Sequence, residues 1–265
     1  ETAVLLRTTT RVNHTRGVCT LEKLTPRRFQ GHFEKNPLRW VPVPAVARRL
    51  RPQQLQRVKK LEELAESSPF NVEEGQGRLG IITAGIAYNY VKEVLEELDA
   101  VDEARILKIG TIFPLPKGRI LSFLAKCDRL LITEELEPYL EGEIRALVQE
   151  RGIVLSIHGK DLIPRMYELS PDRIRPAVAK LLNKECPPIE PFKGMTLPNR
   201  PPLLCAGCTH RNSYYAIKSI ADKDTFFASD IGCYTLGLLP PLRTADAILC
   251  MGASINLASG TAIRN

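Results

Sequence analysis

Three cysteines lie in two short motifs whose spacing suits ligation. Cys205 and Cys208 are separated by two residues, and Cys233 follows farther along the chain. Two thiolates at this spacing can hold one metal ion or two corners of an iron–sulfur cluster, because the turn between them aligns both side chains. Gly207 lies inside that turn and lets it close without a side-chain clash. These cysteines are the first candidates for chemistry.

The residues around the cysteines exclude two common uses of paired thiols. Covalent haem attachment needs a histidine directly after the second cysteine, where this chain has Thr209. A thioredoxin-like dithiol would follow a strand, whereas Cys205 follows a proline-rich stretch. A zinc site and an iron–sulfur cluster both remain open, as do thiols that bind nothing.

The two metal hypotheses differ in their fourth ligand. A zinc site would use four nearby ligands: Cys205, Cys208, Cys233 and His210. A cluster needs a fourth thiolate, which Cys250 or a residue beyond position 265 would supply. No nucleophile–His–Asp set stands out elsewhere in the sequence.

Two glycine turns follow expected strand ends. They are Ser229-Asp230-Ile231-Gly232 and Cys250-Met251-Gly252-Ala253-Ser254. Small residues at a helix N-terminus expose backbone N–H groups that can bind phosphate. Neither turn has the GxGxxG or P-loop pattern, so ordinary strand-to-helix turns are an equal alternative.

Strands and helices alternate from residue 78 onwards. The expected strands are 79–84, 105–109, 129–133 and 153–157, and the expected helices are 88–98, 118–125, 139–149 and 171–182. Alternation with helices of 8–13 residues is typical of βαβ units on a parallel sheet. We therefore predict an α/β domain at residues 76–184.

The flanking regions are less regular. Residues 1–20 hold an expected strand at 3–6, and 21–75 are a proline-rich linker with a basic helix at about 52–66. A second linker at 185–202 leads into 203–265, the start of another α/β domain. The elements expected there are a helix at 214–221, strands at 225–228 and 247–251, and a helix to the end. Both ends suggest that the chain is the central section of a longer protein.

Charge and composition argue against some classes of binding partner. The net charge is +7, and residues 1–75 carry +6 of it, with 14 Lys and Arg against 8 Asp and Glu. No zinc-finger spacing or RNA-binding aromatic pattern accompanies this excess, which argues against nucleic acid. No apolar run approaches the roughly 18–20 residues of a membrane span. Seven cysteines, an odd number, favour reduced thiols and a cytoplasmic protein.

The cysteine and glycine motifs resemble a known family. Residues 200–219, RPPLLCAGCTHRNSYYAIKS, and residues 229–260, SDIGCYTLGLLPPLRTADAILCMGASINLASG, are similar to the large subunit of indolepyruvate:ferredoxin oxidoreductases. These are thiamine-diphosphate enzymes of the 2-oxoacid:ferredoxin oxidoreductase superfamily. The opening LLRTTTRVNHTRG resembles the end of that family's pyrimidine-binding domain. Residues 78–184 resemble its transketolase C-terminal-like domain.

The resemblance implies a site in residues 203–265. Cys205, Cys208 and Cys233 fall where related enzymes hold a 4Fe–4S cluster. The residues implied to face thiamine diphosphate are Asp230, Ile231, Gly232, Cys233, Met251, Gly252, Ala253 and Ser254. The Gly-Asp turn that anchors Mg²⁺ in the family is absent from this sequence.

The resemblance also implies an activity. The parent enzyme would oxidatively decarboxylate aryl-2-oxoacids to acyl-CoA, using coenzyme A and passing electrons to ferredoxin, together with a smaller beta subunit. This section alone is expected to be inactive. The competing hypotheses are a cysteine-ligated zinc scaffold and a non-redox thiamine-dependent enzyme.

Overall fold

The computed structural model forms two compact units, Glu1–Glu190 (unit 1) and Pro191–Asn265 (unit 2). The residues it describes are 4–9, 12–13, 17–20, 33–188, 194, 198 and 201–264. None of the helices in these ranges combines the length and the apolar character required to cross a membrane.

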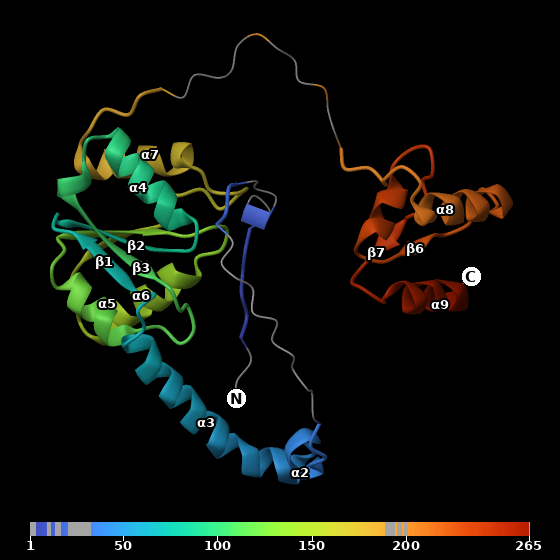
Figure 1. The fold of residues 1–265 in the computed structure, drawn as a ribbon, viewed down its shortest axis with the longest axis horizontal. Helices are drawn as coiled ribbons and strands as arrows, with labels where there is room; N and C mark the ends of the chain where they lie inside the picture. Colours follow the sequence, from blue (N-terminus) through green and yellow to red (C-terminus); the bar gives the residue numbers. More distant parts are fainter. Residues whose placement is uncertain are drawn as a thin grey trace. The chain divides into compact units, whose positions relative to one another are not determined.

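Unit 1 is built on a five-stranded sheet (Figure 1). Its strands are β1 (Val72–Gly75), β2 (Leu79–Ala84), β3 (Ala104–Ile109), β4 (Arg129–Thr133) and β5 (Ser156–His158). Their spatial order is β1-β3-β2-β4-β5. Strands β2 to β5 are parallel, and β1 pairs with β3 in the antiparallel sense. The predicted α/β class with a mainly parallel sheet is confirmed.

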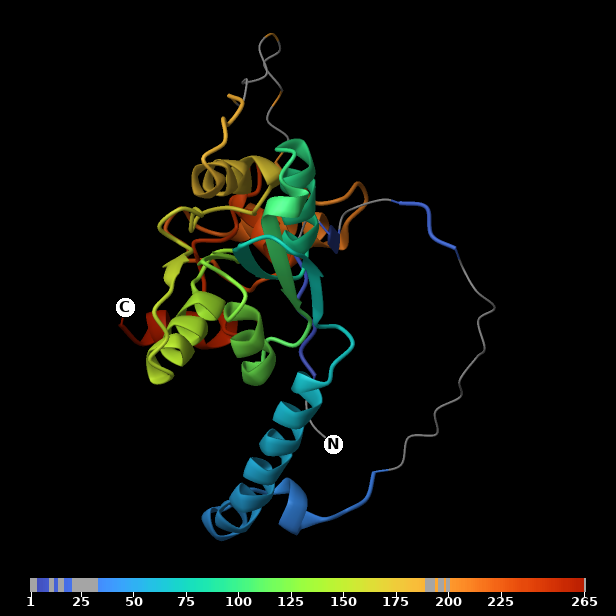
Figure 2. The ribbon, with the colours of Figure 1, turned by 90° about the vertical axis from the view of Figure 1, so that its left-hand side faces the viewer.

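Helices cover both faces of this sheet (Figure 2). Helices α4 (Ala87–Glu97) and α7 (Pro171–Leu182) pack on one face, and α5 (Lys117–Leu124) and α6 (Tyr139–Glu150) on the other. The neighbours Ile81 and Ile82 point to opposite faces and are both fully buried. Strands covered on both faces are apolar at successive positions, which explains why β2 and β4 were predicted correctly.

Strand β1 was not predicted, and it corrects the expected limits of the α/β layer. The sequence Val-Glu-Glu-Gly is polar and half exposed, because an edge strand has only one strand beside it. Residues 72–75 had been assigned to the linker that precedes residue 76. The register Glu73↔Leu107 instead places them in the sheet.

The basic helix is longer than predicted. Helix α3 runs over Pro44–Glu66, and the short α2 (Pro37–Trp40) precedes it. Pro52, where the expected helix begins, lies inside α3. An interior proline removes one backbone hydrogen bond, and the rest of the 23-residue helix tolerates that loss here.

The expected strand at residues 3–6 is also wrong where the structure describes it. Residues 4–9 have no regular secondary structure, and Val4, Leu5 and Leu6 are at least 85% exposed. Residue 3 lies outside the described residues. Without a neighbouring strand among the described residues to take their hydrogen bonds, these apolar residues form no ladder.

Unit 2 is smaller. Its elements are α8 (Thr209–Ile220), β6 (Ala228–Ser229), the 3-10 helix η2 (Cys233–Leu238), β7 (Ala247–Ile248) and α9 (Ser254–Arg264). The strand expected at 225–228 shifts to Ala228–Ser229, and the strand expected at 247–251 shortens to Ala247–Ile248; the two pair in parallel. The predicted strand at 153–157 in unit 1 likewise shifts to Ser156–His158.

Candidate functional site

The cysteine turn of unit 2 leads directly into helix α8. The Cys208 N–H donates to the Cys205 carbonyl at 3.2 Å, which closes the turn. Gly207 has φ +72°, a left-handed conformation that favours glycine. The Cys208 Sγ lies 3.3 Å from His210 Nδ1 in the first turn of α8. The predicted tight turn is therefore present, with the Cys205 thiol exposed and the Cys208 thiol half exposed.

The second motif forms a turn of its own after strand β6. Gly232 has φ +138°, and the Thr235 hydroxyl donates to the Asp230 carbonyl at 3.1 Å. Cys233 is exposed and begins the 3-10 helix η2. Its thiol is thus available on the surface of unit 2.

Aromatic contacts join the two turns. The His210 ring meets the Tyr234 ring edge-to-face, with centroids 5.0 Å apart. The Tyr214 hydroxyl donates to the Tyr234 carbonyl at 2.9 Å. A β-carbon on Gly237 would come within 2.7 Å of the Tyr214 ring, so glycine permits this close packing. His210 contacts Cys208, and Tyr234 follows Cys233, so the two cysteine motifs are neighbours.

The structure does not gather the three thiols into one metal-binding group. Across the described ranges, no three His, Cys, Asp or Glu side chains are placed to hold a metal ion. All seven cysteines are free thiols, and Cys250 is exposed near the second glycine turn. The donor chemistry suits a cluster or zinc, and the ligand set Cys205, Cys208 and Cys233 stays a prediction.

The two glycine turns meet through Asp230. The Asp230 carboxylate accepts the Ser254 N–H at 2.9 Å and the Ser254 hydroxyl at 3.0 Å. Ser254 is the first residue of α9. A carboxylate at a helix N-terminus satisfies an otherwise unpaired N–H group and interacts favourably with the helix dipole. This contact brings together two segments that are 24 residues apart.

A cavity lies beside the second turn. It has a volume of about 390 Å³ and is lined by residues 249–253 and by Asn256 and Leu257. Met251 is 76% exposed and Ile231 47% exposed, so each turn also presents an apolar side chain. Gly252 has φ +83°, and Ala253 is buried beneath the turn.

The hydrogen bonds between Asp230 and Ser254 determine which phosphorylated group could bind at the start of α9. The Ser254 N–H already donates to a carboxylate, so a diphosphate at α9 would meet the negative charge of Asp230. A divalent cation such as Mg²⁺ takes carboxylate and phosphate oxygens together. The site therefore fits a diphosphate that arrives with its metal better than a free anion.

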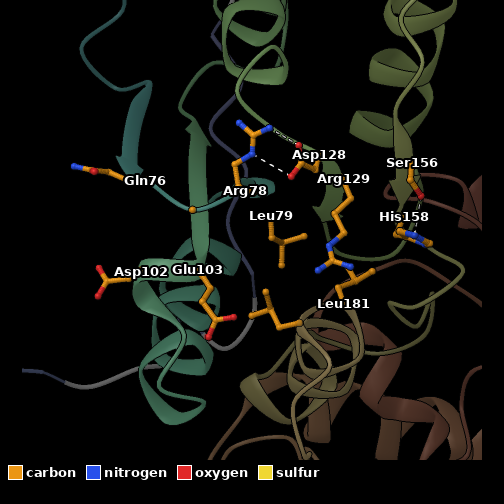
Figure 3. Close-up of a pocket in the computed structure, with 12 residues that line it drawn as sticks. Gln76, Arg78, Leu79, Asp102, Glu103, Asp128, Arg129, Ser156, His158 and Leu181 are labelled. Carbon is orange, nitrogen blue, oxygen red and sulfur yellow. Dashed lines mark hydrogen bonds and ion pairs between the residues drawn. The ribbon is translucent and has the colours of Figure 1, made fainter.

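A second site, in unit 1, was missed from the sequence. A cavity of about 840 Å³ opens at the amino-terminal ends of the parallel strands (Figure 3). Its lining includes Ser156 and His158, and the Ser156 hydroxyl lies 3.2 Å from His158 Nε2. His158 Nδ1 lies 2.8 Å from the Asp161 carboxylate. A Ser–His–Asp set is thus present, contrary to our expectation. The alternation of a strand was the available signal, because residues 156 and 158 share one face.

Comparison with known proteins gives long matches. The chain is 44% identical to the indolepyruvate oxidoreductase subunit IorA of Thermococcus kodakarensis over 274 residues, which are 98% of this chain and 42% of that protein. It is 39% identical to IorA of Methanothermobacter marburgensis over 268 residues, 97% of this chain and 43% of that protein. These matches confirm the resemblance stated from the sequence. The chain spans less than half the length of these relatives.

Other comparisons add little. No protein-family model matches the chain. A solved 2-oxoglutarate:ferredoxin oxidoreductase from Magnetococcus marinus covers 52% of this chain and 23% of its own, at 18% identity and a TM-score of 0.38. That likeness is too slight to support a structural argument.

Proposed function

We propose that this chain, a relative of the indolepyruvate oxidoreductase subunits IorA, is part of an enzyme that oxidatively decarboxylates aryl-2-oxoacids to acyl-CoA. The observation that carries the proposal is the similarity along 97–98% of the chain to subunits of that name. The adjacency of the two cysteine turns supports it, because an iron–sulfur cluster would need cysteine ligands from both turns.

Thiamine diphosphate supplies an electron sink for the loss of CO₂, and a 4Fe–4S cluster supplies an acceptor for single electrons. The Mg²⁺-anchoring turn of the family is absent from this sequence, so in this chain only the Asp230 carboxylate would contact the Mg²⁺ of the diphosphate, and Ser254 would orient that carboxylate through its two hydrogen bonds. The turns at 230–233 and 251–254 would present Ile231 and Met251 to the cofactor's rings. Apolar side chains there limit the access of water to the reacting carbon.

Cys205, Cys208 and Cys233 would bind the cluster. Their thiols are exposed or half exposed on neighbouring turns, and cluster binding would require the two turns to bring them together. His210 contacts the Cys208 thiol and would fix the direction in which that side chain points. Coenzyme A, ferredoxin and a smaller beta subunit are the partners we propose, in the reducing cytoplasm where free thiols persist.

The test is metal analysis of the full-length protein purified without oxygen. We expect a brown protein with broad absorption near ~400 nm, and Cys208→Ser should lose about four iron atoms per chain together with indolepyruvate-dependent ferredoxin reduction. Cys186→Ser is the matched control, because Cys186 is an exposed cysteine of unit 1. It should retain both properties.

Two results would contradict the proposal. A colourless protein containing zinc would favour the scaffold hypothesis. A Cys208→Ser variant with unchanged iron and unchanged activity would show that the cysteine turn does not ligate the cluster.

A further inference from the structure

The Ser–His–Asp set of unit 1 is held by four contacts. Ser156 and His158 lie on β5, and the strand places both side chains on one face. Ser156 Oγ is 3.2 Å from His158 Nε2, and His158 Nδ1 is 2.8 Å from Asp161 Oδ2. The Gly159 N–H donates to Asp161 Oδ1 at 2.7 Å, and Leu162 N–H donates to the Gly159 carbonyl. The turn after β5 therefore fixes the carboxylate against the imidazole.

These contacts decide where the protons lie. Burial raises the pKa of Asp161, but the hydrogen bonds from Gly159 and His158 outweigh this, and the net pKa is lowered. Asp161 is therefore ionised at neutral pH and can only accept. Nδ1 of a neutral His158 must then carry the proton and donate it to Asp161, which leaves the lone pair of Nε2 for the Ser156 O–H. This is the tautomer that a general base for serine requires.

The cavity gives a substrate access to this set (Figure 3). Ser156 and His158 line it on one side, and the apolar side chains of Leu79 and Leu181 line it elsewhere. Arg78 and Asp128 form an ion pair within the lining, and Gln76, Asp102 and Glu103 lie on the side opposite Ser156. The volume of about 840 Å³ suits a small organic molecule.

Arg129 adds a cationic donor next to the serine. It is the direct partner of Ser156 in the register between β4 and β5, so the two side chains leave the sheet on the same face. Arg129 is half buried in the cavity lining. The hydrogen bond from Arg78 lowers the pKa of the neighbouring Asp128 carboxylate, and the charge of Arg129 also acts on that group and helps to lower its pKa. A guanidinium in this position can stabilise an oxyanion that forms at the carbon attacked by Ser156.

We propose that Ser156, His158 and Asp161 form a nucleophilic site that hydrolyses small carboxylic esters in the cavity of unit 1. Ser156 Oγ bonds to the ester carbonyl carbon while its proton passes to His158 Nε2. The bond from that carbon to the alcohol oxygen then breaks, and His158 returns the proton to the leaving alcohol. Water adds to the acyl-serine with His158 again as base, which releases the carboxylic acid and restores Ser156.

Ser156 is exposed, and the His158 and Asp161 side chains are 29% and 50% exposed, so the set lies at the open mouth of the cavity. One feature distinguishes it from a chance surface cluster. A chance serine on an exposed strand has no oriented base, whereas here the histidine is oriented by a carboxylate that is itself anchored by a backbone N–H. The site lies wholly in unit 1 and shares no residue with the cysteine turns. Its activity is therefore independent of the oxidoreductase proposed above.

The test uses the full-length protein with p-nitrophenyl acetate and a fluorophosphonate probe, which reacts only with activated serines. We expect the probe on Ser156, located by peptide mass spectrometry, and ester hydrolysis that falls at least 100-fold in Ser156→Ala. Ser122→Ala is the matched control, because Ser122 is an exposed serine whose hydroxyl donates only to the Gly118 carbonyl. It should retain full activity.

A second variant separates chemistry from folding. Asp161→Asn retains the size of the side chain but removes the charge that fixes the His158 tautomer, so hydrolysis should fall at least 10-fold with an unchanged thermal melt. The proposal is overturned if the probe leaves Ser156 unlabelled in the folded protein. It is also overturned if Ser156→Ala hydrolyses the ester as fast as the parent.

Discussion

Units 1 and 2 differ in how much of their apolar surface is buried. In unit 1 each face of the sheet is covered by two helices, and side chains such as Phe123 and Ile132 are completely buried. In unit 2 helix α8 has no buried residue, and Ile220 and Ile255 are 85% and 74% exposed. A two-stranded sheet is marginally stable by itself. The apolar core of unit 1 therefore accounts for most of the stability found within the described residues.

Unit 2 relies instead on specific polar and aromatic contacts. The Asp230–Ser254 pair joins two turns, and the Tyr214–Tyr234 hydrogen bond joins α8 to η2. Each such contact contributes about 1 kcal/mol, less than the burial of one large apolar side chain. The candidate cofactor turns therefore lie in the unit with the weaker internal support, where loops can adjust to a ligand.

The largest expected difference between the two units is in the cost of truncating one apolar side chain in each, a buried one in unit 1 and an exposed one in unit 2. Phe123→Ala in unit 1 should lower the free energy of unfolding by about 3–5 kcal/mol, because it leaves a cavity at a fully buried site. Ile220→Ala in unit 2 should change it by less than about 0.5 kcal/mol, because that side chain is already in solvent. Chemical denaturation followed by circular dichroism measures both values. A large decrease in the free energy of unfolding of Ile220→Ala would show that unit 2 has an apolar core of its own.

The sequence predicted most of unit 1 for a physical reason. Strands β2 and β4 are buried on both faces and are therefore apolar at successive positions, which is visible without the fold. Strand β1 is an edge strand whose glutamates are held by partners distant in sequence. Glu73 forms ion pairs with Arg105 and Lys126, which no local pattern in the sequence could predict.

The candidate sites depended more on the fold than on the motifs. The motifs named Asp230 and Ser254, but only the structure shows that one caps the helix begun by the other. The Ser–His–Asp set was not predicted from the sequence, because strand β5 was expected to end at residue 157. That limit separates His158 from the strand it shares with Ser156.

The thiol of Cys127 is half buried, whereas that of Cys250 in unit 2 is exposed. Burial raises the pKa of Cys127 to about 11, against about 8.5 for an ordinary thiol. At pH 8, iodoacetamide should label Cys127 about 100-fold more slowly than the exposed Cys250 of unit 2. Mass spectrometry of peptides over time measures both rates. Equal rates would show that unit 1 opens readily around Cys127.

The same shift has a consequence for stability. The folded-state pKa of Cys127 exceeds the unfolded value, so the folded state holds the proton more tightly. Its contribution is complete below about pH 8.5 and is lost as the pH rises through about 11. The free energy of unfolding should therefore fall more steeply between these values in the parent than in Cys127→Ala. An identical pH dependence in both proteins would contradict the assignment.

The smallest effect that we expect is the loss of stability on removing a carboxylate that caps a helix in either unit. Glu134 accepts the N–H groups of Leu140 and Glu141 at the start of α6, as Asp230 accepts that of Ser254 at the start of α9. Removing either carboxylate should cost about 1 kcal/mol, which is about a fivefold change in the local opening constant. Amide hydrogen exchange measures that constant for each helix.

The two caps should nevertheless act over different distances. In Glu134→Ala the core beneath α6 remains, so faster exchange should be confined to the first turn of that helix. In Asp230→Ala few buried contacts hold α9, so exchange should accelerate along the whole helix and in the 230–233 turn. Asp224→Ala, an exposed change in unit 2, is the control and should leave α9 unchanged. If exchange accelerates only in the first turn of the helix in both cap variants, then α9 is supported as well as α6. That result would contradict the claim that unit 2 has weaker internal support.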